Sequence, residues 1–120
     1  WAVTLAQQFG ATIHFFILNQ NDEYNHNKIR ADFNQIKKIL EKNNISFTEK
    51  TSNPKNGSFV KQTISYAKEL NSELIMLSTD PEKITWSLFG SSDEHIIYNT
   101  AKIPTLCINV RDLKIILGGL

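Results

Sequence analysis

The sequence has little cysteine, no long apolar run and almost no excess of charge, and each shortage excludes a class of protein. Its one cysteine, Cys107, has no partner for an internal disulfide, so we expect a reducing, cytoplasmic setting. No apolar run approaches the roughly 20 residues that span a bilayer, so we expect no membrane partner. The formal net charge of +1 gives no electrostatic reason to bind nucleic acid.

The length and composition are those of one globular domain. A chain of 120 residues buries about two-thirds of its unfolded surface, which is enough for one core. The apolar share of 41% and the charged share of 21% are ordinary for such a domain. The chain starts at Trp1 inside an amphipathic pattern and ends in the apolar tail 111–120. We therefore expect one domain over residues 1–110, taken from a longer protein, and then the tail.

Helical and strand patterns alternate along the chain. Four segments have the apolar spacing of a helix. The first contains Ala2, Leu5, Ala6 and Phe9 and ends before Gly10, and the second contains Ile29, Phe33, Ile36 and Leu40. The third runs from Phe59 to Leu70, and the fourth from Ser91 to Lys102. Strand patterns cover Ala11 to Leu18, buried on both faces, Ile45 to Thr51, half exposed at an edge, Glu73 to Leu77, and Thr105 to Val110. The polar stretch Asn19 to Asn27 is predicted to be a loop. This alternation predicts an α/β domain with a mostly parallel sheet and helices on both faces.

The segment from Ser72 to Val110 carries the candidate site. A buried strand leads into a polar loop, and the step Gly90-Ser91 opens a helix before the last strand. This layout puts a helix N-terminus at the carboxyl end of a parallel strand, where α/β sheets bind ligands such as phosphates. The same residues also fit a plain helix cap, in which Ser91 and Glu94 form a capping box. Asp93 and Glu94 weaken the phosphate interpretation because they would repel an anion.

The stretch from Leu74 to Ile108 resembles the C-terminal half of a universal stress protein domain. That family has a strand, two spaced glycines, a nine-residue spacer, and a glycine followed by Ser or Thr. Here Met76 corresponds to the strand end, and the spacer 81–89 leads to Gly90-Ser91. The stretch Ile103 to Ile108 resembles the family's closing strand, and Leu5 to Ile13 resembles its junction between first helix and second strand.

The resemblance implies a fold and a set of site residues. The fold is a three-layer α/β sandwich with a mostly parallel, adenine-nucleotide α-hydrolase-like sheet in the order 3-2-1-4-5. The implied nucleotide-binding residues are Ser78, Thr79, Lys83, Gly90, Ser91 and Ser92. The implied contacts of a homodimer lie on the last strand: Thr105, Leu106, Cys107, Ile108, Asn109 and Val110.

The sequence departs from the family in two places. Leu77 and Asp80 stand where the two spaced glycines let the backbone wrap phosphates, and Lys83 is the nearest cation to offset Asp80. The family's central first strand has no counterpart before Trp1. We expect an upstream segment of a tandem protein, a partner domain or chain, or the tail around Lys114 to Leu117 to fill that place.

We therefore expect a binding or regulatory domain of the stress response that does not turn over a substrate and does not bind ATP in the family's usual way. The alternative is an ATP- or AMP-binding protein with weak nucleotide hydrolase or transferase activity through the Gly90-Ser91 loop. A third possibility is a domain that senses another small ligand.

Other polar and aromatic side chains receive plainer interpretations. No Ser-His-Asp or Cys-His set and no metal site is predicted. His14 is expected to be packed in its strand, and Cys107 to be inert core. Three residues of the polar stretch are expected to be solvated: Asp22, Glu23 and His26. Trp86 and Phe89 are expected to cover the sheet.

Overall fold

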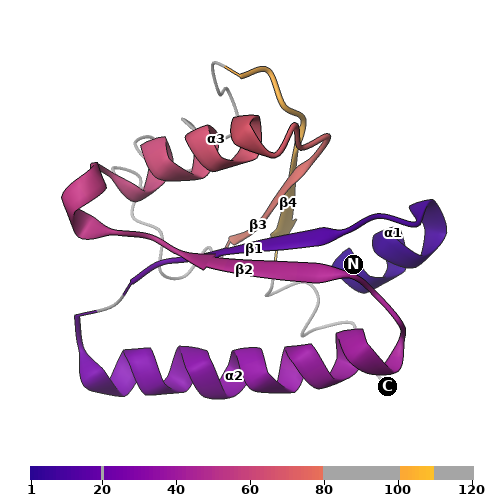
Figure 1. Cartoon of the computed structure of the whole chain (residues 1–120), viewed down its shortest axis with the longest axis horizontal. Helices are drawn as coiled ribbons and strands as arrows, with labels where there is room; N and C mark the ends of the chain where they lie inside the picture. The colour runs from indigo at the N-terminus through magenta and orange to yellow at the C-terminus, as the bar shows by residue number, and fades with distance from the viewer. Residues whose placement is uncertain (20, 80–100, 110–120) are drawn as a thin grey trace. The chain divides into compact units, whose positions relative to one another are not determined.

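The computed structural model describes residues 1–19, 21–79 and 101–109 (Figure 1). The chain divides into two compact units, Trp1–Phe59 and Val60–Leu120. Each unit has a hydrophobic cluster of its own. The predicted boundary at residue 110, before the tail, stays a prediction.

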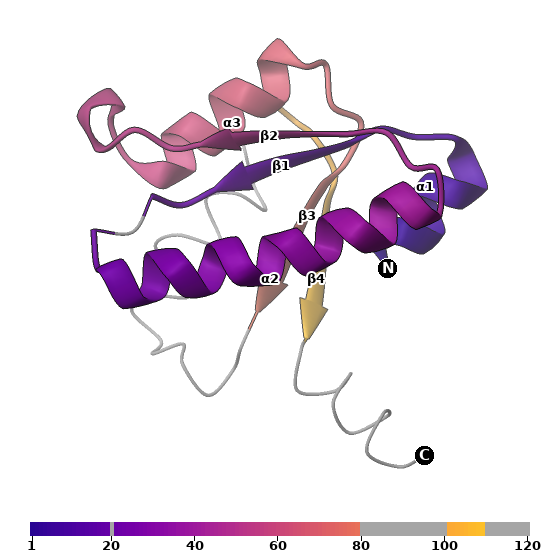
Figure 2. The same ribbon diagram turned by 60° about the horizontal axis from the view of Figure 1, so that its bottom comes forward.

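The first unit is built around one parallel strand pair. Its elements are α1 (Ala2–Phe9), β1 (Ile13–Ile17), α2 (Glu23–Lys42), β2 (Phe47–Thr51) and the short 3-10 helix η1 (Pro54–Asn56). β1 and β2 pair in parallel, with Ile13 opposite Phe47 and Ile17 opposite Thr51. α2 runs back along one face of this pair and so makes the crossover that a parallel connection needs (Figures 1 and 2).

The predicted end of α1 at Gly10 is confirmed. Gly10 takes the left-handed conformation at φ 60°, which a residue without Cβ adopts at little cost. The Ala11 amide then donates to the Ala6 carbonyl at 3.0 Å. Phe9, the last residue of the helical spacing, is 75% exposed. The helix packs instead through Val3 and Ala6 in its earlier turns.

α2 begins earlier than the sequence pattern predicts. Residues 19–27 were expected to form a loop, but the helix starts at Glu23, with Asp22 as its N-cap. One Asp22 carboxylate oxygen accepts from the Asn25 amide at 3.3 Å and from the Asn25 side chain at 2.7 Å. A cap of this kind satisfies backbone donors without burying anything. The first turn carries no apolar stripe, and Tyr24 is exposed there, so apolar spacing could not reveal it.

The core of the first unit gathers at one end of α2. Leu40 is fully buried and clusters with Ala6 and Ile45, and partly buried side chains of α1, β1 and β2 pack against them. Farther along α2, Phe33 is buried and meets Phe15 edge to face at 4.9 Å. Of the predicted α2 stripe, Ile36 is 39% exposed, so the inward face is narrower than expected.

β1 is shorter and less buried than the apolar run predicts. The run Ala11 to Leu18 was expected to be one strand buried on both faces, but β1 covers only Ile13–Ile17 and most of its residues are half-buried. The expectation that His14 is packed is wrong, because His14 is exposed. Side chains alternate along a strand, so His14 lies on the face opposite Ile13 and Phe15. There its Nδ1 lies 2.6 Å from the hydroxyl of Thr48, its partner in the ladder.

The second unit contains α3 (Phe59–Glu69), which starts at the boundary, with β3 (Ile75–Thr79) and β4 (Thr105–Asn109). β3 and β4 also pair in parallel, with Ile75 opposite Thr105 and Thr79 opposite Asn109. Ala67 and Ile75 are buried together, and Val60, Leu77 and Ile103 pack against them. Residues 80–100, which hold the predicted loop with Trp86 and Phe89 and most of the predicted helix Ser91 to Lys102, lie outside the described residues.

The described part of the chain therefore confirms an α/β class with parallel strand pairs. It shows the pair β1–β2 and the pair β3–β4. The finer prediction of a three-layer sandwich with one sheet stays a prediction. Among the helices of the described ranges, none has both the length and the apolar character to cross a membrane.

The buried end of α2 supports a stability test. We expect Leu40→Ala to lower the free energy of unfolding by about 3 kcal/mol, because it removes a fully buried side chain and leaves a cavity. The neighbouring Ile39 is 51% exposed, so Ile39→Ala should cost less than about 1 kcal/mol. Urea unfolding of both variants measures the difference, and equal losses would contradict this packing.

Candidate functional site

Two of the predicted nucleotide-binding residues lie at a strand end. Ser78 and Thr79 are the last residues of β3 and pair with Ile108 and Asn109 of β4. The strand was expected to end at Leu77, with Thr79 opening the loop, but β3 continues through Ser78 to Thr79. The dipeptide therefore lies at the carboxyl end of the parallel pair. The other residues of the predicted set lie outside the described residues: Lys83, Gly90, Ser91 and Ser92. Their arrangement around a ligand stays a prediction.

The residues of the predicted dimer interface form an observed strand. Thr105, Leu106, Cys107, Ile108 and Asn109 make up β4, while Val110 lies outside the described part. β4 pairs with β3 along its whole length. A pairing of β4 with a second copy is not tested by this structure.

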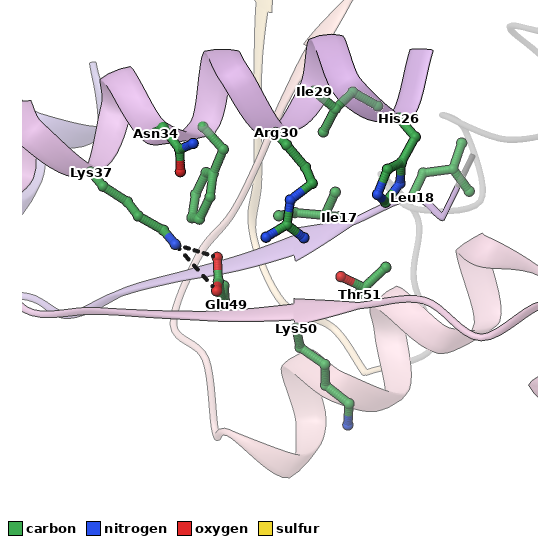
Figure 3. A pocket seen from close by; sticks show the side chains of 11 residues that line it. Ile17, Leu18, His26, Ile29, Arg30, Asn34, Lys37, Glu49, Lys50 and Thr51 are labelled. Atoms are coloured by element: carbon green, nitrogen blue, oxygen red, sulfur yellow. Dashed lines mark hydrogen bonds and ion pairs between the residues drawn. The ribbon is translucent and has the colours of Figure 1, made fainter. Parts of the chain in front are cut away.

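The structure adds a pocket of about 230 Å³ that the sequence did not predict. It lies between α2 and the carboxyl ends of β1 and β2 (Figure 3). Its apolar side is made by Ile17, Leu18, Ile29 and Phe33. Its polar side carries several cations and one carboxylate, that of Glu49.

The position of this pocket follows from the lengths of the elements around it. α2 has 20 residues and is about 30 Å long, whereas β1 and β2 have 5 residues each and are about 16 Å long. The first turns of α2 therefore extend past the strand ends (Figure 1). Side chains from α2 line the pocket together with Ile17 and Thr51, which are the last residues of β1 and β2. The pocket lies where the helix continues and the strands have ended.

One cation of the pocket is already neutralised. The Lys37 ammonium lies 3.1 Å from a Glu49 carboxylate oxygen and 3.3 Å from the other. It also lies 4.8 Å from the centre of the Phe33 ring, a cation–π distance. Lys37 is therefore half-buried between Phe33 and Glu49.

Three other basic side chains line the pocket, and they differ from Lys37 in their surroundings. Figure 3 shows Arg30 reaching from α2 toward the strand ends and His26 hanging over the end of β1. Within the described ranges neither side chain has a hydrogen bond or an ion pair. Lys50 points to the opposite side of β2 from Glu49, because side chains alternate along a strand (Figure 3). It has an interaction partner of its own.

A helical spacing could have revealed this pocket. His26, Arg30, Phe33 and Lys37 are separated by four, three and four residues. At about 100° per residue they share one face of a helix. The predicted loop from Asn19 to Asn27 removed His26 from this series, and without it Arg30 and Lys37 looked like ordinary surface charges.

Among the described residues, no group of three or more His, Cys, Asp or Glu side chains comes together. The expectation that Asp22, Glu23 and His26 are merely solvated is corrected in part. Asp22 caps α2, and His26 lines the pocket.

A second pocket, of about 290 Å³, lies at the amino ends of β1 and β2. Gln7 and Asn43 meet beside it, with the Gln7 amide nitrogen 3.1 Å from the Asn43 side-chain oxygen. All of the residues around this second pocket are uncharged. Charged groups that could act on a ligand are therefore found at one end of the strand pair, the carboxyl end.

No family model, no curated protein and no solved structure matches this chain at a significant level. The resemblance to universal stress proteins therefore depends on the residues and spacings of the sequence.

The ion pair of the pocket supports a double-mutant test. We expect Lys37→Met and Glu49→Gln to show a coupling energy of about 0.5 kcal/mol, because both side chains remain partly exposed to water. Urea unfolding of the wild type, both single variants and the double variant measures this coupling, which should shrink at high salt. A coupling above about 2 kcal/mol would mean that the pair is far better shielded than its exposure indicates.

Proposed function

We propose that the chain is a binding module of the universal stress protein type, with a regulatory role in the stress response and no substrate turnover. The observation that carries the proposal is the pairing of its strands. In a sheet of order 3-2-1-4-5, the second strand pairs with the third and the fourth pairs with the fifth. The observed pairs β1–β2 and β3–β4 have this connectivity if the chain's first strand corresponds to the family's second.

A further support is that β3 ends at Thr79, just before the segment whose sequence has the nine-residue spacer and Gly90-Ser91. Fold likeness alone does not fix a function, so the chemistry of this loop decides which member of the family the chain resembles.

That chemistry argues against the usual mode of ATP binding. Leu77 stands at the first glycine position, and its side chain packs against the core of the second unit. It therefore has a structural role there and is not free to make room for a phosphate. Asp80 adds a carboxylate at the second glycine position, which would repel a triphosphate. We propose that ATP is not the ligand of this chain.

The alternative keeps the nucleotide. An ATP- or AMP-binding protein with weak hydrolase or transferase activity would use the hydroxyl of Ser91 and the backbone amides after Gly90 to hold a phosphate. The two proposals differ in what a nucleotide titration will show.

We expect calorimetric titration with ATP or AMP, with and without magnesium, to give no binding at submillimolar concentration. Submillimolar ATP binding that is lost in Ser91→Ala and kept in the control Ser65→Ala would support the alternative, because Ser65 is an exposed residue of α3.

A gain-of-binding variant tests the same argument in the opposite direction. Asp80→Gly removes the carboxylate and restores one motif glycine, so it should raise the affinity for ATP if the loop otherwise follows the family. Unchanged ATP affinity in Asp80→Gly would mean that the carboxylate does not explain the missing binding.

We also propose that a partner supplies a central strand. In the family order one further strand stands between the second and the fourth, and a neighbouring domain or a second copy of the chain would supply it here. The single cysteine makes a reducing, cytoplasmic setting the one we propose.

The proposed homodimer is tested by its mass. We expect light scattering to give a dimeric mass at tens of micromolar and a fall toward the monomer in a dilution series, because the fraction of a reversible dimer depends on the protein concentration. A monomeric mass at tens of micromolar would contradict an interface through Thr105 to Val110.

A further inference from the structure

We propose that the pocket between α2 and the β1–β2 pair binds a small organic carboxylate, with Arg30 as the group that receives the anion. The residues involved belong to the first unit, so this proposal does not depend on the nucleotide loop or on the family resemblance. Three observations carry it: the charges of the pocket, its apolar side and its place in the fold.

The charges leave one guanidinium unmatched. Glu49 is the single carboxylate among the residues that line the pocket, and it is engaged by Lys37 at 3.1 Å. Arg30 has no partner within the described ranges, although it reaches toward the strand ends (Figure 3). A guanidinium presents a planar fork of donors that fits a carboxylate with two hydrogen bonds. His26 and the hydroxyl of Thr51 line the same pocket and add further donors.

The apolar side of the pocket selects the body of the ligand. Ile17, Ile29 and the Phe33 ring stand beside Arg30 and offer a surface for an aromatic or branched aliphatic group. The volume of about 230 Å³ is below the range usual for drug-sized ligands. A compact acid of about ten non-hydrogen atoms fits this description better than a nucleotide does.

The place of the pocket agrees with the general behaviour of α/β folds, in which ligands bind outside the carboxyl ends of parallel strands. Here the overhang of α2 supplies one wall and the ends of β1 and β2 supply the other. The uncharged pocket at the amino ends offers no comparable group for an anion.

Benzoate is the probe that tests this proposal, because it combines a carboxylate with a compact aromatic ring. We expect a titration of the full chain, followed by NMR, to show saturable shifts at residues around Arg30 at millimolar benzoate. Benzyl alcohol, which lacks the charge, and acetate, which lacks the ring, should each bind at least about tenfold more weakly.

Variants of Arg30 identify the group that binds the anion. Arg30→Gln should weaken benzoate binding about tenfold or more, and Arg30→Lys should fall between because it keeps the charge but not the fork. Lys38→Gln is the matched control, since Lys38 is an exposed cation on the same helix outside the pocket. It should bind benzoate as the wild type does.

Circular dichroism of each variant shows that α2 remains folded. Equal benzoate affinity in the wild type and Arg30→Gln, equal losses in Arg30→Gln and Lys38→Gln, or no saturable shift at millimolar benzoate would each overturn the proposal.

Discussion

The parallel pairing of β1 with β2 is the constraint on which the rest of the first unit depends. Parallel neighbours start at the same end of a sheet, so the chain must travel back between them. α2 makes this return and buries Phe33 and Leu40 as it does so. Because the helix is about twice as long as the strands, it also extends past them, and the pocket forms below its first turns. The core and the pocket are thus two consequences of one crossover.

Features that depend on local chemistry could be predicted from the sequence. Gly10 ends α1 because only a glycine takes a left-handed conformation freely. Features that depend on tertiary context could not. The start of α2 is stabilised by the Asp22 cap and not by burial, so no apolar period marks it. β1 is shorter than its apolar run because ladder pairing with β2 covers five positions, from Ile13 to Ile17.

The candidate site divides in the same way. The apolar pattern from Glu73 to Leu77 indicates a strand close to the observed β3, Ile75–Thr79, but it did not show that Ser78 and Thr79 are strand residues. The environment of Lys37 could not be predicted, because its partner Glu49 comes from a different element, 12 residues away. The spacing of residues along the helix alone predicts that such a lysine is exposed to solvent. The ion pair between Lys37 and Glu49 neutralises one cation of the pocket, so Arg30 is left without a partner among the described residues. No local sequence pattern indicates this difference between the two cations.

Both sets of candidate residues follow one physical rule, although they belong to different units. Ser78 and Thr79 are the last residues of β3, and the pocket around Arg30 lies at the ends of β1 and β2. Both sets therefore lie at the carboxyl ends of parallel strands. At a strand end the backbone leaves the hydrogen-bonded ladder. Residues there can contact a ligand without disrupting the sheet, so strand ends are suitable places for binding groups. The amino ends of β1 and β2 show the contrast, since the pocket there is slightly larger but uncharged. Size alone therefore does not distinguish the two pockets; the difference lies in their charge, because Arg30 has no partner among the described residues.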